Sequence, residues 1–206
     1  MRGKSEMRTI FHPAGLRRFR RDTRGGSAIE FGIIAPLLLM GLLGTVEIGR
    51  AFSNNRHFVS AISSAGDLVS REEYLGTSDG GASSNLANMM LSIKHLMAPY
   101  DPSTLKLAVF SVKASNSTPD TGKVQWGYSY NGKGAPAKCS DYALPAGLVP
   151  LGGSIIVVDA TYNFKSLFGS YVPGINPDMT WNEKSYHSPR NSCVDYVKGD
   201  NCISSC

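Results

Sequence analysis

The stretch that decides the fold is RRFRRDTRGGSAIEFGIIAPLLLMGLLGTVEIGR, which covers residues 17–50. It begins with a cluster of arginines, passes through a pair of glycines, and then becomes almost wholly apolar from Phe31 to Val46. One carboxylate, that of Glu30, stands at the front of this apolar run. An acidic side chain at the middle of a membrane helix costs about 2.5–3.5 kcal/mol, and less near the helix end. Because no partner for Glu30 is visible nearby in the sequence, we expect its partner on another molecule.

The positive charge of the chain is confined to its N-terminal part. Residues 1–25 carry a net charge of +6, whereas the whole chain carries +5, so residues 26–206 have a net charge of −1. Outside the tail no basic patch remains that could follow a phosphate backbone, and nucleic-acid binding is therefore not predicted. A basic tail before an apolar helix is the positive-inside arrangement. It predicts a cytoplasmic tail, with the residues after Val46 on the far side of the membrane.

A cleaved signal peptide is the competing interpretation of the same stretch. It requires a small-residue cleavage motif after the apolar run, and GTVEIGRA at residues 44–51 fits that motif poorly. The small-residue pair Gly25-Gly26 lies before the run instead. The sequence therefore predicts a retained anchor, with any cleavage at its cytoplasmic edge.

The cysteines all lie in the distal half of the chain, at Cys139, Cys193, Cys202 and Cys206. An even number of cysteines in an exported domain favours two disulfides, with three possible pairings that the sequence leaves open. The alternative is a metal site built from the last three cysteines and His187, but their spacing lacks the paired C-x-x-C of common zinc sites. We therefore predict disulfides and no metal or other cofactor.

The predicted fold is α+β, with four segments along the chain. Residues 1–25 form a basic cytoplasmic leader, and residues 26–47 form a transmembrane helix. Residues 48–75 continue this helix in amphipathic form, and residues 76–206 form a periplasmic α+β domain. Pro36 lies within the transmembrane helix, where a proline is tolerated but loosens one turn.

Hydrophobic periodicity predicts the elements of the periplasmic domain. A second, short helix carries apolar residues at helical spacing, with Ser83 or Ser84 as its N-cap, and stops at Pro99. Alternating patterns then predict about four strands at residues 105–113, 124–130, 154–164 and 179–187. We expect these strands to form an antiparallel sheet that packs against the amphipathic helix.

The residue patterns of enzymes are missing from the sequence. It contains no G-x-S-x-G, P-loop, H-E-x-x-H or C-x-x-C motif, and its four histidines lie in four different predicted segments. Asp159 stands within an apolar strand and could be a perturbed carboxylate, although alternation favours a solvent-facing position. The chain is therefore predicted not to be an enzyme.

Three short motifs carry a family resemblance. RGGSAIEF at residues 24–31, APLLL at residues 35–39 and EIGRAF at residues 47–52 resemble the start of TadE-like proteins. These are minor pilins, or pseudopilins, of the tight-adherence (Tad/Flp) pilus of bacteria. The distal segments 155–164 and 186–190 are similar to the family pattern in layout.

The resemblance implies processing by a prepilin peptidase at the cytoplasmic face of the membrane. The cut would follow Gly25 or Gly26, and the position of Glu30 as the fifth residue of the mature chain favours the first. Phe31 is then the aromatic residue that follows the glutamate in this family. Glu30 and Pro36 are expected to act in assembly.

The implied partners are the prepilin peptidase, other Tad pilins and minor pilins, the assembly platform of the inner membrane, and the membrane itself. The implied location is the bacterial inner membrane, in a single pass with a periplasmic C-terminal domain, or an extracellular pilus.

Three other interpretations remain open. The chain could be an uncleaved single-pass membrane protein with a periplasmic binding domain, or a secreted enzyme with a long signal region. It could also be an adhesin at a pilus tip, with the row Trp126, Tyr128 and Tyr130 as a contact face. For that row, packing within the sheet is favoured.

Overall fold

A computed structural model describes residues 25–171, 174 and 178–200 of the chain. Its longest element is helix α2 (Gly26–Ser70), which runs through Pro36. The structure divides into two compact units between Leu43 and Gly44. In the first unit almost every described side chain is exposed. A helix suits such an apolar segment because it satisfies its backbone hydrogen bonds internally.

Helix α2 ends at Ser70, so the predicted amphipathic continuation to residue 75 was wrong at its end. The reason is a long-range pairing. Strand β1 (Tyr74–Gly76) lies parallel to strand β7 (Asp195–Val197), and the Ser70 carbonyl accepts a hydrogen bond from the N–H of Arg190 at 3.0 Å. The backbone after Ser70, which local periodicity assigned to the helix, therefore hydrogen-bonds to distant residues instead.

The second helix, α3 (Asp79–Leu96), begins earlier than predicted. Its N-cap is Ser78, whose hydroxyl accepts a hydrogen bond from the Gly81 N–H at 3.2 Å, so the prediction of Ser83 or Ser84 was wrong. A carboxylate in the first turn, that of Asp79, also suits the positive end of the helix dipole. The predicted apolar face is confirmed, because Leu86, Met90 and Ile93 are buried.

A five-stranded antiparallel sheet follows, in the order β4-β3-β2-β5-β6. The predicted α+β fold is confirmed, and the four predicted strands correspond to the four long ones. The short fifth strand, β4, was not predicted; it pairs Tyr142 with Gly122. The elements are a 3-10 turn η2 (Pro102–Thr104) and the strands β2 (Lys106–Ala114), β3 (Thr121–Tyr130), β4 (Asp141–Ala143), β5 (Ser154–Lys165) and β6 (Asp178–His187).

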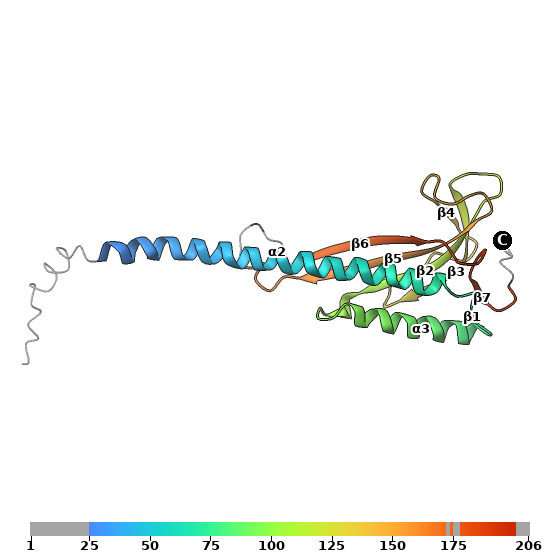
Figure 1. Ribbon diagram of the computed structural model, residues 1–206, viewed down its shortest axis with the longest axis horizontal. Coiled ribbons are helices and arrows are strands. Elements are labelled where there is room, and N and C mark those ends of the chain that lie inside the picture. The colour runs from blue at the N-terminus through green and yellow to red at the C-terminus, as the bar shows by residue number, and fades with distance from the viewer. Residues whose placement is uncertain (1–24, 172–173, 175–177, 201–206) are drawn as a thin grey trace, which may run out of the picture. The chain divides into compact units, whose positions relative to one another are not determined.

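The second unit has apolar clusters on both faces of the sheet. On one face, helices α2 and α3 run alongside the sheet of the second unit (Figure 1). There Phe58 of α2 and Met90 of α3 share a buried cluster with Val158 of β5. On the other face, Val157 packs with Leu144 from a connecting segment. Successive residues of a strand point to opposite faces. The near-continuous apolar run of β5 therefore serves both clusters.

The aromatic row of β3 belongs to the helix-covered face. Trp126 is buried, and its indole N–H donates a hydrogen bond to the carbonyl of Val194 at 2.7 Å. Tyr128 and Tyr130 are partly buried against the same cluster. Packing within the sheet, the favoured interpretation of this row, is confirmed.

Candidate functional site

The start of helix α2 is open on all sides among the described residues. Gly25 and Gly26 are exposed, and a Cβ atom built on either one would meet nothing within 4 Å. A glycine backbone without side chains is accessible to another protein. The predicted cleavage site thus lies where the described chain is uncovered.

Glu30 lies one turn further along the helix, with Phe31 beside it. The Glu30 side chain is exposed and has no hydrogen-bond or ion-pair partner among the residues that the structure describes. Phe31 is 69% exposed. The position near the helix N-terminus suits a carboxylate because of the helix dipole. A partner on another molecule can therefore reach Glu30 without displacing a contact within the described chain.

The helix behind Glu30 presents an apolar surface. Pro36 is exposed there, and so are most of the large apolar side chains, including Ile29, Ile33, Ile34, Leu37, Leu38, Leu39 and Leu42. Helix α2 is long and apolar enough to cross a membrane. A signal sequence near the N-terminus would have the same length and apolar composition. A core helix of a soluble protein would instead be mostly buried. This apolar surface therefore requires lipid or other apolar helices around it.

The comparison with protein families covers this part of the chain. Residues 25–67 match the model of the family described as TadE-like protein. This segment is TadE-like. The match confirms the N-terminal part of the resemblance, whereas the distal segments 155–164 and 186–190 lie outside it. A TadE-like domain indicates a protein associated with the Tad pilus and with a membrane. No curated protein and no solved structure matches the chain.

The TadE-like segment contains a second carboxylate whose role the sequence analysis missed. Glu47 is only 1% exposed. Its carboxylate accepts hydrogen bonds from the guanidinium of Arg50, at 3.1 and 3.3 Å, and from the N–H of Leu167, at 2.6 Å. Glu47 therefore ties helix α2 to the turn that follows β5. An acid just after the apolar run, with an arginine three residues later, was the available signal.

A close contact also holds the C-terminal end of the TadE-like segment against strand β6. The ring of His187, at the end of β6, lies so near Gly66 of α2 that a Cβ atom there would be 2.0 Å from its Cδ2. The His187 Nε2 is 2.7 Å from the hydroxyl of Ser185. Burial lowers the pKa of His187 below its ordinary value. Helix α2 and strand β6 can therefore pack this closely only with a glycine at position 66.

The remaining predicted residues are only partly described. The leader, except Gly25, lies outside the described residues, and so do Cys202 and Cys206. Cys139 and Cys193 are not free thiols. Since no pairing is described, the two disulfides stay a prediction. Within the described ranges, no group of three or more His, Cys, Asp or Glu side chains is placed to hold a metal ion.

Asp159, the carboxylate within β5, has a structural explanation. Its side chain is 22% exposed and lies 2.9 Å from the ammonium of Lys133 and 3.6 Å from that of Lys184. The carboxylate is partly exposed between two cations, whereas its strand neighbours Val158 and Ala160 are buried, so the alternation is confirmed and the exposure is only partial. The register explains this, because Asp159 lies opposite Lys184 on the neighbouring strand β6.

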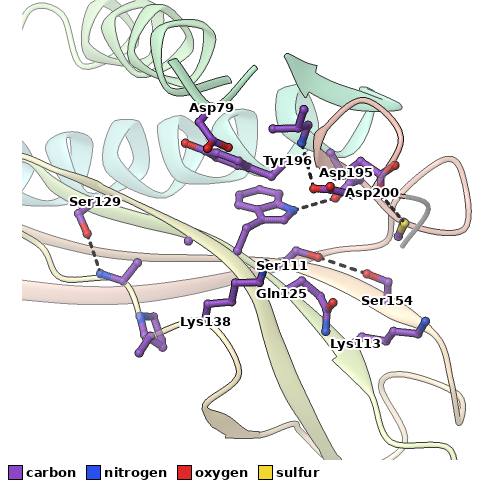
Figure 2. A pocket seen from close by; sticks show the side chains of 18 residues that line it. Asp79, Ser111, Lys113, Gln125, Ser129, Lys138, Ser154, Asp195, Tyr196 and Asp200 are labelled. Carbon is purple, nitrogen blue, oxygen red and sulfur yellow. Dashed lines mark hydrogen bonds between the residues drawn. The ribbon is translucent and has the colours of Figure 1, made fainter. Parts of the chain in front are cut away.

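A pocket of about 720 Å³ lies at the β7 end of the second unit. Figure 2 shows Asp79 close to the ring of Tyr196, and Asp195 and Asp200 grouped further along the pocket. That ring packs at 5.9 Å from Trp126. The pocket joins an aromatic floor to a rim of mixed charge, because Lys113 and Lys138 line it together with the three carboxylates.

Proposed function

We propose that this chain is a minor pilin, or pseudopilin, of a Tad/Flp-type pilus. The observation that carries the proposal is the placement of Glu30. It is an exposed carboxylate near the start of an exposed apolar helix, four residues after Gly26, within a TadE-like segment. An acid in this position is unfavourable in a membrane unless another molecule neutralises it.

In the proposed maturation, a prepilin peptidase cuts the bond between Gly25 and Gly26. The cut removes the leader and its net charge of +6. That charge holds the N-terminus at the cytoplasmic face, and its loss allows the helix to leave its original position. The chain acts as the substrate of a peptidase and has no catalytic role of its own.

Cleavage also creates a cation that can pair with Glu30. The new α-amine of Gly26 is positively charged near neutral pH. In the assembled pilus, the amine of one subunit pairs with the Glu30 carboxylate of its neighbour. A buried carboxylate is best compensated by a cation held close to it. Processing is thereby coupled to assembly, because an uncut subunit cannot supply this amine.

The proposed setting follows from the same features. Before assembly the protein is anchored in the bacterial inner membrane, with the second unit in the periplasm. Its partners are the prepilin peptidase, other Tad pilins and minor pilins, and the assembly platform. Its role is in pilus assembly and adhesion.

The alternative function is an uncleaved single-pass membrane protein with a periplasmic binding domain. The pocket beside Tyr196, which is lined by aromatic rings, carboxylates and lysines, is the observation that favours it. In that case the leader persists and Glu30 has no assembly role. The two functions therefore differ in the mass of the mature chain.

N-terminal sequencing and intact-mass measurement of the native membrane form test the proposal. A chain that begins at Gly26 supports it. A chain that retains residues 1–25 favours the alternative, and one that begins after Val46 indicates a secreted protein.

A substitution at Glu30 tests the assembly step separately. Glu30→Gln keeps the shape of the side chain but removes its charge, so we expect normal membrane insertion and loss from sheared pili. The matched control is Glu72→Gln, since Glu72 is also exposed but lies beyond the end of α2. Normal incorporation of the Glu30→Gln protein would contradict the proposed pairing.

A further inference from the structure

The second unit carries an exposed apolar surface of its own. Four large side chains form it: Ile48 is 66% exposed, Phe52 65%, Leu167 63% and Tyr171 75%. The first two belong to helix α2, and the other two belong to the turn after β5. We refer to these four residues as the exit patch. Such a group of apolar side chains, in one part of a folded unit, indicates an interaction surface.

The hydrogen bonds of Glu47 bring the two halves of the exit patch together. Its carboxylate accepts a hydrogen bond from the Leu167 N–H at 2.6 Å. This bond places the turn after β5 next to Ile48, the first patch residue on the helix. A groove of about 520 Å³ continues the surface, with Ile48 and Phe52 on one side and Met179 and Trp181 on the other. Helix α2, the turn after β5 and strand β6 therefore contribute to one apolar surface.

The carboxylate at the groove is compensated, and one cation lies beside the patch: the guanidinium of Arg56 is 5.4 Å from the centre of the Phe52 ring. Among the described residues that line the groove, Glu47 is the charged one, and Arg50 pairs with it at 3.1 Å. The Glu47 side chain is 1% exposed, so its carboxylate is withdrawn from the surface. An apolar phase can therefore cover the groove without stripping water from an unpaired charge.

The covalent chain determines what the exit patch meets. The apolar run ends at Val46, and the patch begins two residues later, at Ile48. The Leu167 N–H donates a hydrogen bond to Glu47, the residue between Val46 and Ile48. In a chain anchored by α2, this place is the boundary between hydrocarbon and water. Tryptophan and tyrosine are enriched at that boundary, and Tyr171 is the exit-patch residue of this kind.

We infer that the exit patch rests in the interfacial layer of the membrane that helix α2 crosses. The turn after β5 then acts as a second membrane contact beside the helix. This contact restricts how the second unit tilts while the subunit waits in the membrane. The inference rests on the membrane anchoring in the proposed function, but not on cleavage or pilus assembly.

A tryptophan reporter in the full chain tests this contact in lipid vesicles. Leu167→Trp adds a fluorophore to the patch, and Leu151→Trp is the matched control because Leu151 is 58% exposed in a different loop. Leu38→Trp reports on insertion of the helix itself. Each variant is compared with the parent chain in phosphatidylcholine vesicles whose acyl chains are brominated near the headgroup or near the bilayer centre.

We expect headgroup-proximal bromine to quench the added Leu167→Trp emission, with weak quenching by aqueous acrylamide. The Leu151→Trp emission should show the reverse. If both are quenched by acrylamide alone while Leu38→Trp is quenched by deep bromine, the inference is overturned and the anchor stands. If Leu38→Trp also escapes lipid quenching, both the anchor and the inference fail. Shielding that disappears at low protein-to-lipid ratio would assign the patch to a second copy and overturn the inference.

Discussion

Two glutamates stand at opposite ends of the same apolar run, and their surroundings differ. Glu30 is exposed in the first unit, without a partner among the described residues, whereas Glu47 is 1% exposed in the second unit and bonded to Arg50 and Leu167. The side chains are identical, so the difference comes from what the fold places around them. A carboxylate satisfied within its own chain supports the fold. One left unsatisfied is available to another molecule.

Two glycines of helix α2 repeat this contrast. A Cβ atom on Gly32 would meet nothing within 4 Å, whereas one on Gly66 would collide with the ring of His187. In the first unit a glycine leaves the helix surface free for neighbours. In the second unit the glycine at position 66 allows helix α2 and strand β6 to pack closely.

The largest expected effect separates the two glutamates. Glu47→Ala leaves the Leu167 N–H and the Arg50 guanidinium without their acceptor, and we expect the second unit to lose about 2–3 kcal/mol of stability. Glu30→Ala should leave stability unchanged. Thermal unfolding of the detergent-solubilised full chain, followed by circular dichroism, measures both. Equal melting temperatures for the two variants would remove the basis of the comparison.

The next effect separates the two glycines. Gly66→Ala forces its methyl group against the His187 ring, and overpacking of this kind costs about 1–2 kcal/mol. Gly32→Ala removes only the entropic penalty of a glycine within a helix, so the same unfolding experiment should show no loss. A Gly66→Ala protein as stable as its parent would show that β6 can move away from α2.

The smallest effect is a pH dependence confined to the second unit. Because burial lowers the pKa of His187 below 6.5, the unfolded chain binds its proton more readily than the folded one. The stability that the neutral His187 contributes should therefore be fully present above pH 6.5 and should decline as the pH falls below that value towards the lowered pKa of the folded chain. Melting temperatures at about pH 7.5 and about pH 5 measure it.

Two histidine variants provide the controls for that experiment. His187→Gln should flatten the dependence, whereas His95→Gln, at an exposed position of α3, should leave it in place. The charge of Asp67 partly offsets the effect of burial on His187. The neighbouring Arg71 lowers the pKa of Asp67 below 3.8, so Asp67 stays charged throughout the tested range. A dependence that survives His187→Gln would assign it to another group.

Local patterns were enough for the long elements and insufficient for the short ones. The four long strands were visible because their apolar residues alternate over many positions. Strand β4 and the β1–β7 pair span three residues each. They exist because distant segments meet, as Tyr74 does with Asp195. The end of α2 at Ser70 depends on the same pairing.

The candidate site divides in the same way. The roles of Gly25, Gly26, Glu30 and Phe31 could be predicted from the sequence because the prediction depends only on the order of these residues along the chain. The role of Glu47 could not, since Leu167 is 120 positions away. The need for glycine at position 66 likewise depends on a histidine from β6.

The order of residues alone established the basic tail, the apolar helix with an acid at its front, and the alternating strands. These features arise from charge and hydrophobicity acting over neighbouring positions. Folding established which of the two acids is satisfied, where the helix ends, and how the exit patch is assembled. These features depend on contacts between segments far apart in the chain, and such contacts leave little local trace in composition or periodicity.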